Sequence, residues 1–254
     1  MSTGAGHRVY RPGVSLVHQT PAHVKIVATL AFVVVVVTTP AEAYAAFGAY
    51  ALLLAAALTV AGIPLAAAAR HLVIEVPFVL FALALPFVAG GEQVQVWALS
   101  LSVPGLHGAW NLLVKATLGV LASLVLAATT TPLSLVQGLQ RLRMPQLLVS
   151  IIAFMIRYAD IVTAELSRMR IARESRAFVG RGPRSWPVLA RCAGALFIRC
   201  YERGERVHLS MLSRGYAGRL LIGGDRAATR RDVAVAAALP SCALVVACAA
   251  WMLV

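Results

Sequence analysis

Charged residues, and acidic residues above all, are scarce in this sequence. Of its 254 residues only 13% are charged, with 10 Asp and Glu against 23 Lys and Arg, whereas 60% are hydrophobic. A water-soluble domain of this length needs far more polar surface to cover its core, so the apolar excess is expected to face lipid. The scarcity of charge therefore indicates a membrane protein.

Motifs for chemistry are missing as well. The sequence has no GxxxxGK[ST] phosphate-binding loop, no HExxH pattern and no Ser/His/Asp arrangement of an intramembrane hydrolase. Its six histidines show no H-x3-H spacing, and its four cysteines form no CxxC pair. We therefore expect no enzyme, no metal site, no disulfide and no cofactor in this chain.

The charges that are present are mostly positive, with a formal net charge of +13. In a soluble protein this balance would suggest a nucleic-acid partner. In a membrane protein it has another explanation, because cationic loops stay in the cytoplasm and attract anionic lipid. We expect a lipid membrane as partner and no nucleic acid.

Five apolar segments are long enough, or nearly so, to cross a bilayer core, which takes about 20 helical residues. They are residues 25–39, 44–63, 72–89, 110–131 and 233–254. Pro77 and Pro86 predict a kinked or broken helix in the third segment. The predicted fold is all-α: a polytopic helical membrane protein with about five transmembrane helices and an inserted helical cytoplasmic module.

The cationic residues predict the orientation. Residues 133–231 contain 18 of the 23 Lys and Arg residues and 6 acidic residues, an excess of 12 positive charges, whereas residues 90–109 contain no Lys or Arg. The positive-inside rule then places the N-terminus and the long segment in the cytoplasm and the C-terminus outside the cell inner membrane. Lys115 is the exception, and we expect it to snorkel to the outer interface.

The first segment permits a second interpretation. Lys25, a short apolar run and the small residues around Glu42 also resemble a cleavable signal peptide. Cleavage would leave the orientation of the other four segments unchanged, so the topology does not decide between the two interpretations.

The predicted organisation has three parts: residues 1–131 with the N-terminal tail and four membrane helices, 132–231 with the cytoplasmic helices, and 232–254 with the last membrane helix. Residues 147–156 are apolar but too few to span, so we expect an interfacial or packed helix start. Apolar residues then recur at helical spacing and form one stripe, at Met155, Ala159, Val162, Leu166 and Met169.

Two predicted helices of this module end on a similar pattern. The first ends on Ser175-Arg176-Ala177-Phe178, and the second, expected from Trp186 to about Arg214, ends on Ser213-Arg214-Gly215-Tyr216. A single C-terminal Arg-Gly pair needs no function, since Arg complements the helix dipole and Gly forms a left-handed cap. The repetition at two successive helix ends favours a functional role.

These residues resemble the T component of energy-coupling factor (ECF) transporters, in particular the Q-type subunit of cobalt and nickel transporters. The resemblance covers nearly the whole chain, is strongest over residues 157–219, and includes the stretch 196–206 that leads into the second motif. The family's first motif normally ends in Arg-Gly, whereas Ala177 replaces the glycine here. A left-handed backbone at Ala177 would be strained.

The resemblance implies a non-catalytic transmembrane coupling subunit. In such a subunit Arg176 and Arg214 would each insert into a groove of one of two ABC-type ATPase subunits, and Ser175, Ala177, Ser213 and Gly215 would shape the two helix ends. ATP would be bound by these partners, and a separate small membrane subunit would bind the substrate, which could be cobalt, nickel or a vitamin.

Two other functions remain open. The chain could be a membrane anchor or scaffold that recruits an acidic cytoplasmic partner without any role in transport. It could also, with less support, be an autonomous permease. The predicted membrane segments contain few ionisable residues, with Glu75 and Lys115 placed near segment ends, and this scarcity argues against a substrate path through the chain itself.

Overall fold

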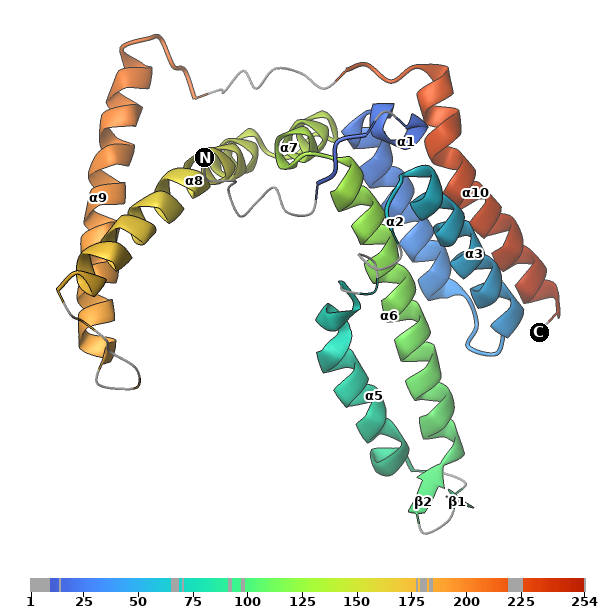
Figure 1. The fold of residues 1–254 in the computed structure, drawn as a ribbon. Helices are drawn as coiled ribbons and strands as arrows, with labels where there is room; N and C mark the ends of the chain where they lie inside the picture. The colour runs from blue at the N-terminus through green and yellow to red at the C-terminus, as the bar shows by residue number, and fades with distance from the viewer. Residues whose placement is uncertain are drawn as a thin grey trace. The chain divides into compact units, whose positions relative to one another are not determined.

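The computed structural model describes residues 10–13, 15–64, 69, 71–90, 93–96, 99–176, 178, 182, 185–218 and 226–253. Its helices (Figure 1) are α1 Leu16–Gln19, α2 Ala22–Thr38, α3 Tyr44–Val60, η2 Leu72–Glu75, α5 Val76–Val88, α6 Val103–Thr129, α7 Pro132–Arg141, α8 Gln146–Glu174, α9 Trp186–Leu212 and α10 Arg230–Leu253. A short hairpin of β1 Gln93–Val96 and β2 Leu99–Ser102 precedes α6. The predicted helical membrane fold is confirmed, and the hairpin is an addition to it.

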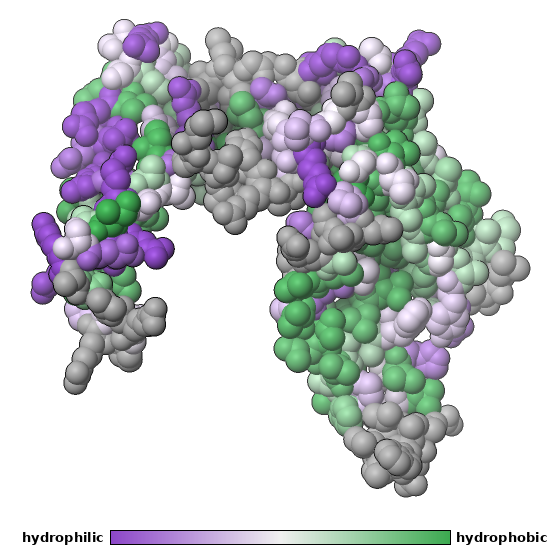
Figure 2. Space-filling view, viewed as in Figure 1, coloured by the Kyte–Doolittle hydropathy of each residue, from purple (hydrophilic) through white to green (hydrophobic). Residues whose placement is uncertain are grey.

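The chain folds as two compact units, with the boundary inside α7. The bundle unit comprises Val9–Gly138 and Asp225–Val254, and the arm unit includes Leu139–Gly224. Hydrophobic surface covers α5, α6 and α10 of the bundle unit, whereas hydrophilic surface covers much of α8 and α9 in the arm unit (Figure 2). The bundle unit thus carries the surface suited to lipid, and the arm unit lies within the predicted module 132–231.

Three helices of the described chain are long and apolar enough to cross a membrane: α6, α8 and α10. Helices α2, α3 and α5 are shorter, with 17, 17 and 13 residues. The helix expected to start within residues 147–156 is present as α8, but its apolar part was expected to be too short to span, whereas α8 is long and apolar enough by length and composition. The structure continues it as one helix of 29 residues through Arg157 and Asp160, because two isolated charges do not interrupt helical hydrogen bonding.

The third predicted span is broken, as its prolines predicted. The short 3-10 helix η2 leads into α5, and Pro77 lies in the first turn of α5. Proline is well tolerated there because the first-turn N–H groups have no acceptor within the helix. Pro77 therefore begins α5, and only Pro86 lies inside it.

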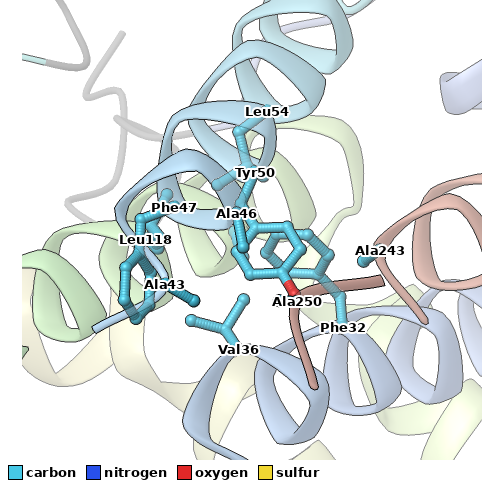
Figure 3. Packing of buried hydrophobic residues seen from close by; sticks show 11 residues of the cluster. Phe32, Val36, Ala43, Ala46, Phe47, Tyr50, Leu54, Leu118, Ala243 and Ala250 are labelled. Carbon is cyan, nitrogen blue, oxygen red and sulfur yellow. The ribbon is translucent and has the colours of Figure 1, made fainter. Parts of the chain in front are cut away.

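The core of the bundle unit forms where α2, α3, α6 and α10 meet (Figure 3). Its side chains include Phe32, Val36, Phe47, Tyr50, Leu54, Leu118, Ala122, Ala243 and Ala250. The Tyr50 ring packs edge-on against Phe32, and its hydroxyl is 3.0 Å from the Thr39 Oγ1 atom. Small alanines on α10 let this helix approach its neighbours closely. Helix α2 is thus part of the core.

Two lysines join the antiparallel helices α2 and α6. Lys25, near the start of α2, donates from Nζ to the Thr129 carbonyl oxygen at the end of α6, at 3.0 Å. Lys115 of α6 donates to the carbonyl oxygens of Val37 and Thr39 at the end of α2, at 2.8 and 2.9 Å. Each ammonium satisfies carbonyl groups that have no partner within their own helix. We expected the Lys115 side chain to snorkel to the outer interface. In the structure its ammonium group binds the two carbonyl oxygens at the end of α2.

Glu75 packs against the middle of α6. Its side chain is buried, and Thr117 donates to its Oε2 atom at 3.0 Å. Its Oε1 atom has no hydrogen-bond partner among the described residues. The sequence placed Glu75 near a segment end. The structure agrees, since Glu75 lies in η2 at the start of this segment, and it sets Glu75 beside Thr117 near the midpoint of the 27-residue helix α6.

Candidate functional site: two arginine-bearing helix ends

The end of α9 has the cap that its sequence predicted. Gly215 adopts a left-handed backbone with φ of 81°, and its N–H donates to the Leu212 carbonyl at 3.0 Å. The Tyr216 N–H donates to the Met211 carbonyl, five residues earlier, also at 3.0 Å. These two bonds define a Schellman cap, in which glycine is favoured because it has no Cβ atom to clash.

The end of α8 is closed in the same way. The Phe178 N–H donates to the Arg173 carbonyl, again five residues earlier, at 3.1 Å, and the Arg176 N–H donates to the same carbonyl at 3.1 Å. Ala177, which occupies the sequence position that Gly215 has at the other end, lies outside the described residues. The two chain reversals thus share the bond that defines their geometry.

The two predicted serines also correspond. Ser175 donates from Oγ to the Ala172 carbonyl at 3.1 Å, and Ser213 donates to the Ser210 carbonyl at 3.0 Å. Each hydroxyl therefore bonds to the last turn of its own helix, three residues back. The serines shape the two helix ends, while a different side chain remains available to a partner.

That side chain is the arginine. Arg176 and Arg214 are both exposed, whereas the aromatic residues that follow them are half-buried. Tyr216 packs edge-on against the His208 ring, with 6.5 Å between the ring centroids. Within the described part of the chain neither guanidinium has an ion pair. Among the described residues each helix end thus presents one exposed guanidinium without an ion pair, a group that binds carboxylates with two parallel hydrogen bonds.

An acidic residue links the two helices that carry these ends. Glu165 of α8 forms ion pairs with Arg199 of α9 and, at 2.6 Å, with Arg168 of its own helix. Hydrogen bonds from Arg168 and Arg199 hold the pKa of the Glu165 carboxyl below its usual range. A second ion pair of α8 joins Arg170 and Glu174, which are four residues apart, at 2.8 Å. Sequence reasoning missed Glu165 because its partner Arg199 is 34 residues away.

The apolar faces of α8 and α9 are largely exposed in the described part of the chain. Met155 and Leu166 of the predicted stripe are 66% and 47% exposed, and on α9 Phe197 is 70% exposed. Helix α9 has no buried residue, and α8 has only Val149 and Ser150. Met155, Ala159 and Val162 of the predicted stripe line a pocket that α8 shares with α9, whereas Leu166 is exposed. The stripe is left as a surface for lipid or another protein.

Comparisons with known proteins cover both helix ends. A family model described as Cobalt transport protein, CbiQ, matches residues 13–222. An uncharacterized protein of Methanocaldococcus jannaschii is 34% identical over 102 residues, 40% of this chain and 38% of that protein. A second one from this organism is 27% identical over 183 residues, 68% of this chain and 62% of that protein.

A third relative carries a functional name. A fused cobalt transport protein, CbiMQ, of Methanocorpusculum labreanum is 33% identical over 108 residues, 42% of this chain and 18% of that protein. The chain spans less than two thirds of the length of each of these three relatives. The family match, by contrast, extends from the start of the bundle unit through both arginine-bearing helix ends. This chain belongs to the CbiQ family of cobalt transport proteins.

Proposed function

We propose that this chain is the transmembrane coupling subunit of an ECF-type ABC importer. It passes the ATP-driven motion of two ATPase subunits to a separate membrane subunit that binds cobalt. The observation that carries this proposal is the correspondence of the two helix ends. Each has the same closing hydrogen bond and the same serine contact, and each presents one exposed arginine without an ion pair.

Two equivalent ends suit two equivalent partners. Helices α8 and α9 are long, with 29 and 27 residues, and each arginine lies at the C-terminal end of its helix. A guanidinium held by a carboxylate through two hydrogen bonds resists rotation as well as separation. Because the last turn is fixed by its own hydrogen bonds, a movement of the partner is passed to the helix instead of being absorbed in the chain reversal.

The proposed topology has the N-terminus and the arm unit in the cytoplasm and the C-terminus outside. The excess of positive charge between residues 133 and 231 supports this orientation. The ATPases would then meet the arm unit on the side where ATP is available. The exposed apolar faces of α8 and α9 would contact lipid or the substrate-binding subunit.

The proposal is tested by purifying the full transporter through a tag on this chain. Two ATPase chains and a small membrane protein should co-purify, and cells should accumulate cobalt. The double variant Arg176→Glu, Arg214→Glu should lose ATPase association and cobalt uptake while remaining in the membrane. The matched control is Arg141→Glu, Arg191→Glu, which reverses two exposed arginines of the arm unit away from the helix ends. It should keep both activities.

Other outcomes would support other functions. A scaffold would bring down a different acidic partner and would not be needed for cobalt uptake. An autonomous permease would support uptake without any ATPase. If uptake and assembly survive the reversal of both Arg176 and Arg214, the coupling role is wrong.

A further inference from the structure

A second feature of the arm unit is a cationic pocket between α8 and α9. Its volume is about 590 Å³, and four arginines line it: Arg157 of α8 and Arg203, Arg206 and Arg214 of α9. No Asp or Glu is among the residues that line this pocket. None of the four arginines takes part in an ion pair with a described residue. Like charges brought together without a counter-ion favour binding of an anion.

The surroundings of the pocket indicate what kind of anion. Phe154 and Tyr158 also line it, with their ring centroids 6.2 Å apart. Along the first three turns of α8, Leu147, Ile151 and Met155 are 71%, 45% and 66% exposed. Their spacing of four residues sets them on one side of the helix. A cluster of guanidiniums thus adjoins an exposed apolar stripe, which matches a molecule with an anionic head and apolar chains.

We propose that this pocket binds the phosphate of an anionic phospholipid headgroup, with the acyl chains along the exposed stripe at the start of α8. Basic pockets and helices beside a membrane bind such headgroups, and each Lys or Arg near an anionic surface strengthens the attraction. The guanidinium fork matches the geometry of phosphate oxygens. A bound headgroup would anchor the α8 start at the bilayer surface and would touch Arg214, which belongs to the proposed coupling site. The lipid site does not depend on that proposed function.

The test uses the purified full-length chain in a neutral detergent. Native mass spectrometry measures binding of phosphatidylglycerol and, as a zwitterionic reference, phosphatidylcholine with the same acyl chains. The pocket variant is Arg157→Gln, Arg203→Gln, which leaves Arg214 in place. Its matched control, Arg141→Gln, Arg191→Gln, removes two exposed charges outside the pocket. We expect the pocket variant to bind phosphatidylglycerol about thirtyfold more weakly and the control to bind it as the unchanged chain does.

Further measurements distinguish lipid binding from the binding of other anions and from misfolding of the variant. The charge-conserving variant Arg157→Lys, Arg203→Lys should keep most of the affinity, and inorganic phosphate in large excess should not displace the lipid. The proposal is overturned if the lysine variant loses as much affinity as the glutamine variant, or if both lipids bind equally. Equal weakening in the control pair, or displacement by inorganic phosphate, overturns it as well.

Discussion

The two arginine-bearing ends share their backbone hydrogen bonds but differ in the residue at the cap. Gly215 supplies the left-handed backbone at the end of α9, whereas the sequence has Ala177 at the corresponding position after α8. A third helix end shows that glycine is not required. At the end of α7, Arg143 has φ of 62°, and the Met144 N–H closes the turn on the Leu139 carbonyl at 3.1 Å. The hydrogen bonds specify the geometry, and the residue at the cap tunes its stability.

The largest effect should come from reversing one arginine at a time. If each helix end holds one ATPase, Arg176→Glu and Arg214→Glu should weaken ATPase association by similar amounts. Loss of one partner of a buried, hydrogen-bonded charge pair costs about 2 kcal/mol or more, roughly thirtyfold in affinity. The measurement is the affinity of the purified ATPases for the full-length chain reconstituted in nanodiscs.

The comparison of the two single variants shows whether both helix ends bind an ATPase or only one of them does. Similar losses support two equivalent contacts. A loss confined to Arg214→Glu would mean that only the end of α9 carries an ATPase contact, and the equivalence inferred from the hydrogen bonds would be wrong. Arg191→Glu, on the exposed surface of α9, serves as the control and should leave the affinity unchanged.

A smaller effect is expected from changing the cap alone. Gly215→Ala places a Cβ atom at a left-handed position with no neighbouring atom within 4 Å, so only backbone strain is added. This strain costs about 1 kcal/mol. Amide hydrogen exchange should report it, because the Tyr216 N–H closes the cap and should exchange about fivefold faster. The reciprocal change, Ala177→Gly, tests the expectation from the sequence that alanine weakens the first end.

The matched control for this variant lies on the same helix. Gly204 is inside α9 and has no atom within 4 Å of an added Cβ. There the same substitution should stabilise the helix by up to about 1 kcal/mol, because alanine is the better helix former. Faster exchange at Tyr216 in both variants would show that the effect is not specific to the cap.

The parts of this fold that the sequence predicts well are the local ones. The bounds of α9, the cap at Gly215 and the pair of Arg170 and Glu174 all depend on residues within one or two turns of one another. Helical periodicity and capping rules act over that range. Both helix ends could therefore be identified from their sequence pattern before their geometry was known.

The contacts that the sequence did not predict join residues far apart in the chain. Lys25 reaches Thr129 across 104 residues, Lys115 reaches Val37 across 78, and Glu165 reaches Arg199 across 34. No local pattern marks these partners, because they meet only after the helices pack. The exposed stripe of α8 shows the same limit, since periodicity identifies an apolar face but does not say what covers it.

The smallest effect is expected from removing the ion pair that links helices α8 and α9. Glu165→Gln removes the charge that pairs α8 with Arg199 of α9, whereas Glu174→Gln, the matched control, removes a pair within α8 only. Both pairs are exposed, so each variant should lower cobalt uptake less than the changes above.

Because the pKa of Glu165 is lowered in the folded chain, its pairing holds above the ordinary carboxyl pKa and is lost only as the pH falls through the lowered value. Titration of Glu165 should therefore give cobalt uptake no pH dependence near neutral pH. Glu165→Gln should be non-additive with Arg199→Gln and additive with Arg170→Gln; additivity in both combinations would mean that the ion pair does not couple the two ends.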